Sequence, residues 1–132
     1  MDDSERFAAG MKKRRKVLGD AWVERSITRR NDFNGDFLDF LTRSCWGDVW
    51  LRPHFDDRTR RIIVISTMIA LGRWEEFTLH VRAGLAHDLE PCDLKEVLLQ
   101  TAVYAGVPAA NTGFHIANEQ LNAGLNVQGK EN

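Results

Sequence analysis

Three side chains that could perform acid–base chemistry and bind an anion, Arg73, Glu76 and His80, recur at intervals of three and four residues. On a helix this spacing places them on one stripe, with neighbouring Cβ atoms about 5–6 Å apart. At that separation a carboxylate influences the protonation of an imidazole, so the stripe could hold an acid–base pair. The alternative is that Glu76 and His80 form a surface pair beside an apolar core stripe that begins at Phe77.

A second candidate group combines aromatic rings with a cation. Trp46 and Trp50 lie four residues apart and are followed by Arg52 and the chain-turning Pro53. Indole N–H groups and a guanidinium could wall a pocket for an anion. Alternatively, both indoles pack in the core or at a subunit interface.

Three arginines, Arg58, Arg60 and Arg61, crowd the first turn of a helix that Asp56 and Asp57 are expected to cap. The helix dipole disfavours cations at this end. We therefore expect an anion, a carboxylate side chain or a substrate to neutralise at least one of them.

The elements that must position these residues are predicted to be helices. Apolar residues at helical spacing and their stop signals predict a first helix that ends at Gly19, a connection over 20–30, and a second helix from Asp32. The phenylalanines of this second helix, Phe33, Phe37 and Phe40, are expected to face the core together with Leu41.

The later helices follow from clearer signals. A helix that is apolar nearly all round ends at Gly72 and is expected to be buried on most faces. The helix with the Arg73/Glu76/His80 stripe follows, then helices that begin near Pro91 and Pro108. Since no segment alternates like a strand, the fold class is all-α, with about six to seven helices in one domain, 1–132. Its helical core covers about 30–122, and 126–132 is a disordered tail.

The composition limits which kinds of partner and which cellular location are expected. Lys and Arg number 18 against 19 Asp and Glu, giving a net charge of -1, so neither nucleic acid nor an anionic membrane is expected. The basic run Lys12–Lys16 is interpreted as a solvated helix face or a subunit contact. Cys45 and Cys92 show no metal-ligand or disulfide spacing. No apolar run is long enough for a membrane span, and the acidic opening is unlike a signal peptide, so we expect a cytoplasmic protein.

Three long segments carry a resemblance to a known family: FNGDFLDFLTRSCWGDVWLRP, TRRIIVISTMIALGR and LHVRAGLAHDLEPCDLKEVLLQTAVYAGVPAANTGFHIANE. They are similar to the carboxymuconolactone decarboxylase family, which also includes AhpD-like alkylhydroperoxidases. The resemblance extends to the ERFAAGMKKRRKVLGD opening, and the WGDVWxRP block is typical of the decarboxylase branch. It implies cofactor-free conversion of gamma-carboxymuconolactone to 3-oxoadipate enol-lactone and CO2, in the protocatechuate branch of the 3-oxoadipate pathway. It also implies a ring-like homohexamer.

The redox branch of the family uses a C-x-x-C-x-x-x-H motif. Placing His80 on its histidine puts Arg73 and Glu76 at the two cysteine positions. Without these thiols, an AhpD-like peroxidase or redox protein lacks its nucleophile and its resolving partner. A non-catalytic oligomeric binding protein on the same helices is the third possibility.

The resemblance also implies residue roles. The substrate is a lactone with two carboxylates, and it serves as its own electron sink, so no cofactor or metal is required. His80 is expected to be the proton donor or the enolate stabiliser, with Glu76 setting its protonation state. Arg73 and Arg52 would bind the carboxylates.

The remaining substrate-binding candidates are of several kinds. Trp46 and Trp50 are expected to wall the pocket. Arg60, Tyr104 and His115 are further candidates, although His115 has apolar neighbours and could instead be a core or interface histidine.

Overall fold

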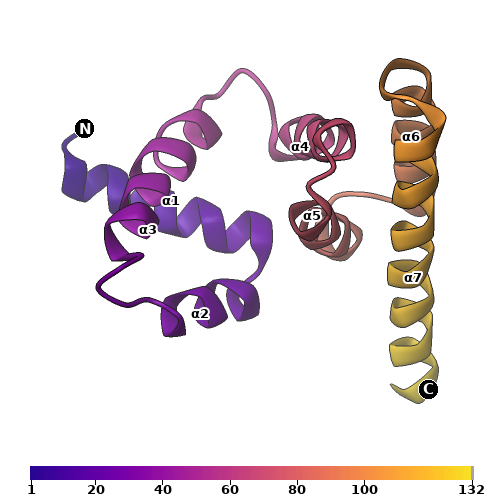
Figure 1. The fold of residues 1–132 in the computed structure, drawn as a ribbon. Helices are drawn as coiled ribbons and strands as arrows, with labels where there is room; N and C mark the ends of the chain where they lie inside the picture. Colours follow the sequence, from indigo (N-terminus) through magenta and orange to yellow (C-terminus); the bar gives the residue numbers. More distant parts are fainter. Residues whose placement is uncertain (132) are drawn as a thin grey trace. The chain divides into compact units, whose positions relative to one another are not determined.

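The computed structural model describes the backbone of residues 1–131 and the side chains of residues 1–124. In this part of the chain every regular element is a helix and none is a strand, which confirms the all-α prediction (Figure 1). The chain divides into two units, Met1–Asp57 and Arg58–Asn132. The single domain over 1–132 stays a prediction. The predicted disordered tail, 126–132, lies outside the residues whose side chains are described.

The first unit contains three α-helices and two short irregular helices. They are α1 (Asp3–Leu18), α2 (Asp20–Thr28), α3 (Gly35–Leu41), the π-helical turn η1 (Thr42–Trp46) and the 3-10 turn η2 (Val49–Leu51). A capping box starts α1, because the Glu5 amide donates to the Asp2 carboxylate and the Asp2 amide donates to Glu5. As predicted, α1 ends at Gly19, where φ is +90°.

The connection predicted over 20–30 is wrong, because residues Asp20–Thr28 form helix α2. This short helix buries Val23 completely, and Arg14 Nη2 of α1 donates to Ser26 Oγ at 2.9 Å. A nine-residue helix with one buried side chain gives only a short periodic signal. Its stability comes from packing on α1, which no local pattern reveals.

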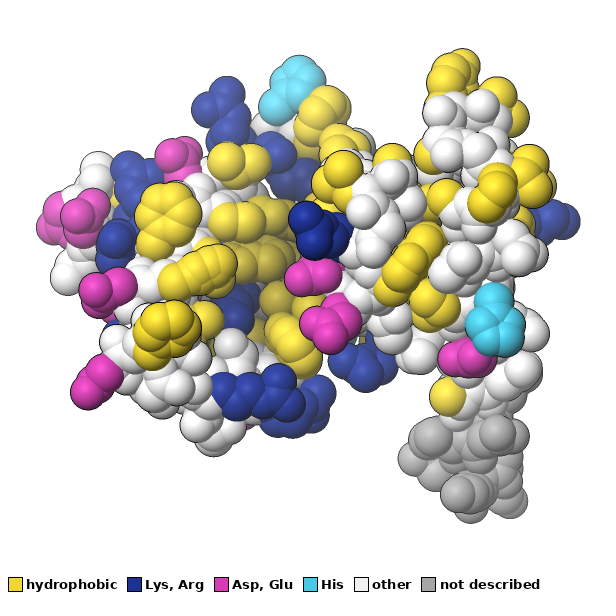
Figure 2. All heavy atoms as spheres, viewed as in Figure 1, with side chains coloured by type: hydrophobic (Ala, Val, Ile, Leu, Met, Phe, Trp, Pro, Cys, Tyr) yellow, Lys and Arg dark blue, Asp and Glu magenta, His cyan; other side chains and the backbone are white. Residues whose placement is uncertain are grey.

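The predicted core position of Phe33, Phe37 and Phe40 is also wrong. All three side chains are exposed, Phe33 at 98% of its surface, and hydrophobic side chains are visible over α3 (Figure 2). We call these three residues the phenylalanine face. The buried side chains of this region come instead from the π-helical turn that follows α3, which buries Thr42 and Trp46.

Helix α1 and the turn after η1 meet backbone to backbone at two glycines. A Cβ atom at Gly10 would collide with the Thr42 carbonyl oxygen and lie 2.7 Å from the Gly47 nitrogen. A Cβ atom at Gly47 would collide with the Arg6 carbonyl oxygen. The close approach therefore requires glycine at both positions.

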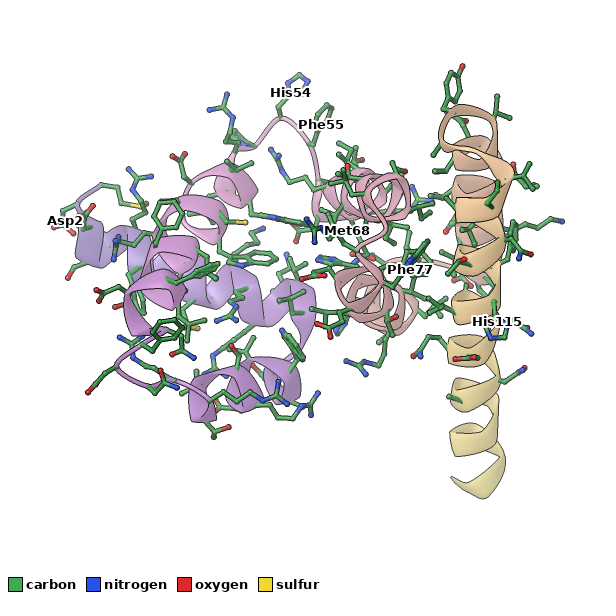
Figure 3. The ribbon with its side chains drawn as sticks, in the orientation of Figure 1. Asp2, His54, Phe55, Met68, Phe77 and His115 are labelled. Atoms are coloured by element: carbon green, nitrogen blue, oxygen red, sulfur yellow. The ribbon has the colours of Figure 1, made fainter. Side chains whose placement is uncertain are left out.

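The second unit contains α4 (Asp57–Leu71), α5 (Trp74–His87), α6 (Pro91–Ala105) and α7 (Val107–Glu131). Figure 1 shows α6 and α7 side by side, with α4 and α5 seen end-on. Their core is a cluster that includes Ile65, Ile69, Phe77 and Leu98; Phe77 and Met68 are marked in Figure 3. None of the helices in the described residues is long and apolar enough to cross a membrane.

Helix α4 departs from its predicted burial. Ile65 and Ile69 are fully buried, but Ile63 and Leu71 are exposed, so only one side of the helix lies in the core. Its other side borders a groove of about 790 Å³ shared with α6. The expectation that α4 is covered on most faces is therefore wrong for this chain by itself.

The junction before α5 matches its prediction. Gly72 has φ +70°, the Arg73 amide donates to the Met68 carbonyl at 2.9 Å, and the Gly72 amide donates to Ile69 at 3.2 Å. These are the two hydrogen bonds of a Schellman motif, which ends α4 and sets where α5 begins. The predicted start of α6 at Pro91 is confirmed as well.

Candidate functional site

His80 lies in the middle of α5 and is only 6% exposed. Its neighbours Phe77 and Val81 on the same helix are fully buried in the core cluster. Because α5 turns this side inward, the imidazole is carried into the interior with them. A buried polar ring such as this imidazole needs hydrogen-bond partners.

A buried arginine contacts the imidazole. Arg61 of α4 is 1% exposed, and its Nη1 lies 3.3 Å from His80 Nδ1. The same guanidinium donates from Nε to Asp88 Oδ1 at 2.8 Å. Arg61 thus joins His80 in α5 to the carboxylate just beyond its end, and we call this group the His80–Arg61–Asp88 cluster.

Helix α5 is shaped to receive this arginine. His80, Gly84 and Asp88 follow one another at intervals of four, which is one stripe of the helix. A Cβ atom at Gly84 would lie 2.8 Å from Arg61 Cδ and 2.8 Å from Leu89 Cδ1. The missing side chain at Gly84 therefore leaves the space in which the Arg61 stem lies.

The cluster sets the protonation of the histidine. Burial, and then the positive charge of Arg61, lower the pKa of His80 from 6.5 to about 4. Both causes disfavour the imidazolium ion. His80 is therefore neutral at physiological pH.

The first-turn arginines behave as predicted. Arg61 pairs with Asp88, and Arg58 Nη2 lies 2.8 Å from Asp93 Oδ1. Carboxylate side chains thus offset the unfavourable helix dipole. Sequence reasoning missed Arg61 and Asp88 as site residues, although the charge conflict in the first turn and the four-residue spacing of His80, Gly84 and Asp88 were visible signals.

The other two members of the predicted catalytic stripe occupy the beginning of α5. Arg73 is the residue at the N-cap, and Glu76 is in the first turn; both are exposed. The shift in the pKa of His80 has burial and Arg61 as its causes. The predicted tuning of His80 by Glu76, and the catalytic roles of Glu76 and Arg73, stay predictions.

The further candidates of the second unit lie apart. Arg60 is half-buried on α4. Tyr104 is 85% exposed and borders the groove between α4 and α6. His115 borders a different groove, between α6 and α7, and neither lining includes His80.

His115 projects from α7 beside an acidic group (Figures 2 and 3). Its side chain is 75% exposed, and Nε2 lies 2.9 Å from Glu119 Oε1 one turn later. The possibility that it is a core histidine is therefore wrong, whereas its place at an interface or in substrate binding stays a prediction.

The tryptophans of the first unit stack on each other. The Trp46 and Trp50 ring centroids are 4.8 Å apart at 26°, and both rings are buried. Trp46 ends the π-helical turn η1, and Trp50 lies within the 3-10 turn η2. Arg52 follows η2 and is exposed. The roles of Trp46, Trp50 and Arg52 in binding stay predictions.

Metal-ligating side chains do not gather in the part of the chain that the structure describes. No group of three or more His, Cys, Asp or Glu residues there could hold a metal ion.

Comparisons with known proteins give a consistent result. A family model described as the carboxymuconolactone decarboxylase family matches residues 35–119. The 4-carboxymuconolactone decarboxylase of Acinetobacter baylyi is 41% identical over 90% of this chain and 89% of its own length. The nitrosuccinic acid decarboxylase of Metarhizium robertsii is 28% identical over 88% of this chain and 81% of its own. A 4-carboxymuconolactone decarboxylase sequence from Pseudomonas putida is 52% identical over 48 residues, which are 36% of this chain and 100% of that sequence.

Proposed function

The chain belongs to the carboxymuconolactone decarboxylase family, and from this premise we propose that it decarboxylates 4-carboxymuconolactone (gamma-carboxymuconolactone) to 3-oxoadipate enol-lactone, as a step of protocatechuate catabolism. The observation that carries the proposal is the 41% identity to a protein of that name along about nine tenths of both chains. The thiol peroxidase alternative is not favoured, since Arg73 and Glu76 occupy the positions of the redox cysteines.

The reaction itself makes modest demands on the protein. The bond between the ring carbon and its carboxylate breaks, and the electron pair passes through the ring double bond to the lactone carbonyl oxygen. The enolate then takes up a proton at the carbon alpha to the carbonyl. The protein must hold the leaving carboxylate, stabilise the enolate oxygen and allow that protonation.

Residues of the second unit can meet these demands. We assign His80 to the enolate or the proton, and Glu76 and Arg73 to the same catalytic group. The position of Arg73 supports a role with a carboxylate, because the N-terminus of α5 adds its partial positive charge to the guanidinium. Arg60, Tyr104 and His115 remain substrate-binding proposals.

The stacked pair Trp46 and Trp50, together with Arg52, remain proposed substrate-binding residues on the basis of the resemblance. What supports them is chemical type: two rigid aromatic walls and an exposed guanidinium suited to a dicarboxylate.

We further propose that the protein assembles as a homohexamer. Exposed apolar side chains support this, both on the phenylalanine face of the first unit and, in the second unit, at Val103, Tyr104 and Val107. Large apolar groups left in water on a small chain are typical of surfaces that pack against other subunits.

The test is an assay of purified, metal-stripped protein with freshly generated 4-carboxymuconolactone, following CO2 release and appearance of the enol-lactone. We expect turnover without additives, and a loss of about 100-fold or more in kcat for His80→Ala. His87→Ala, an exposed histidine of the same helix, is the matched control and should keep normal turnover. Near-normal turnover of folded His80→Ala would exclude the assigned role of His80.

The substrate needs its own comparison. A folded wild-type protein that fails with the lactone contradicts the proposal. In that case nitrosuccinic acid, the compound after which the fungal relative is named, is the first alternative to assay.

A further inference from the structure

We propose that Arg61 is a positioning residue that holds His80 as its neutral Nε2–H tautomer, so that the imidazole presents a fixed hydrogen-bond donor to the substrate. The second half of this inference rests on the proposed function. The tautomer itself does not, because it follows from the contacts of the His80–Arg61–Asp88 cluster.

The direction of one hydrogen bond decides the tautomer. Arg61 Nη1 lies 3.3 Å from His80 Nδ1. A guanidinium in a protein stays protonated and can only donate, so Nδ1 must be the acceptor. A neutral imidazole carries one N–H, which is then at Nε2.

Arg61 is held firmly enough to impose this choice. Its Nε donates to Asp88 Oδ1 at 2.8 Å, and the planar guanidinium fixes the direction of Nη1 once Nε is engaged. The stem lies in the space left by Gly84, and the residue is 1% exposed. Turning the imidazole to place an N–H at Nδ1 would bring two donors together in a buried site, at a cost comparable to an unsatisfied buried polar group.

The tautomer has a chemical consequence. A neutral imidazole is a very weak acid, so His80 keeps its proton and stabilises the enolate oxygen by donating a hydrogen bond from Nε2. The electron pair of the broken carbon–carbon bond resides on that oxygen until the alpha carbon takes a proton from water. The low pKa of His80, about 4, agrees with an imidazole that stays neutral throughout.

Nitrogen NMR of the wild-type protein tests the tautomer directly. With ¹⁵N-labelled histidine, the two ring nitrogens of a neutral imidazole give well-separated signals, and the ring protons show which nitrogen is protonated. His80→Gln identifies the His80 signals among those of the four histidines. We expect a protonated Nε2 and an unprotonated Nδ1 near neutral pH. A protonated Nδ1 would overturn the inference.

Variants of the arginine test its positioning role. Arg61→Met should abolish the single tautomer, giving a mixture, and should lower kcat about tenfold or more with a smaller change in KM. Arg61→Lys keeps the charge but not the planar fork, so it should not restore the tautomer. A folded Arg61→Met protein that retains both the Nε2–H tautomer and its kcat would contradict the proposal.

A milder variant covers the case in which these proteins do not fold. Asp88→Asn keeps the shape of the Arg61 partner but weakens its hold, and should shift the His80 signals toward tautomer exchange. Unchanged His80 signals in Asp88→Asn would show that Asp88 is not needed to hold Arg61 in place.

The two proposals fail in different ways. An Nε2–H tautomer in a protein that does not turn over the lactone refutes the proposed function alone. Turnover by a protein whose His80 carries its proton at Nδ1 refutes the positioning role alone.

Discussion

At the scale of single residues, an imidazole and a guanidinium share a buried site, and a carboxylate makes this arrangement stable. Two cations in contact there would repel each other, so the neutral form of His80 is the one compatible with Arg61. Asp88 offsets the charge of the buried arginine, since its carboxylate lies 2.8 Å from Arg61 Nε. His80 is thus confined to one charge state over most of the pH range.

This confinement predicts a pH dependence of stability. The folded pKa of His80, about 4, lies below its ordinary value of 6.5, so the unfolded chain binds more protons between these values. The free energy of unfolding should therefore fall as the pH decreases from 6.5 toward 4, by at most about 3 kcal/mol from this residue.

Urea unfolding at about pH 7 and about pH 5 measures the effect. His80→Gln cannot titrate, so the wild-type protein should lose more stability than this variant between the two conditions. Equal losses in both proteins would show that His80 is not held neutral in the folded state.

Residue types and spacing brought His80 to attention, but not its partner. Arg61 lies 19 positions away, on another helix, and the sequence alone does not distinguish it from Arg58 and Arg60. Only the packing of α4 on α5 selects the one that reaches the imidazole. Glu76 shares the helical stripe of His80 by spacing, and its side chain is exposed; its predicted role stays a prediction.

At the scale of helices, the stop signals were the most informative part of the sequence. Gly19, Gly72 and Gly106 all have positive φ, a backbone conformation that glycine adopts more easily than other residues because it has no Cβ atom. The short helix α2 and the π-helical turn η1 could not be predicted, because packing within the first unit stabilises them. The helix propensities of the individual residues do not indicate such tertiary contacts.

The turn at Gly72 allows a comparison of one substitution at two sites. Gly72→Ala should lower the free energy of unfolding by about 1 kcal/mol, because alanine is strained at φ +70°. Gly124→Ala, within α7 and with open space around it, should instead raise it by up to about 1 kcal/mol. Urea unfolding compares the two, and a shift of the same sign in both would contradict the role of the Schellman motif.

At the scale of the whole molecule, large apolar side chains remain exposed in both units. The side chains of the phenylalanine face are all more than half exposed, and Val103, Tyr104 and Val107 are exposed as well. Helical spacing predicts that the phenylalanines share one face of a helix, but it does not show whether that face packs within the chain. An assembly would bury them between chains.

Phe37→Ser tests this explanation. If the phenylalanine face is a subunit contact, the variant should form smaller species than the wild-type protein, as measured by light scattering after size-exclusion chromatography. The neighbouring exposed residue provides the control, since Asp36→Ser should leave the mass unchanged. A wild-type mass in the Phe37→Ser protein would exclude this face from the assembly.

The crossing of Gly10 and Gly47 bears on how such a protein can diverge. Most core contacts drift by exchange of one side chain for another of similar volume, with neighbours adjusting in turn. Here each glycine faces main-chain atoms of the opposite segment, which have no alternative rotamer to adopt. The exposed residues of α1 and of η1 can therefore be substituted during evolution. Gly10 and Gly47 can be substituted only if the backbones of both segments shift together.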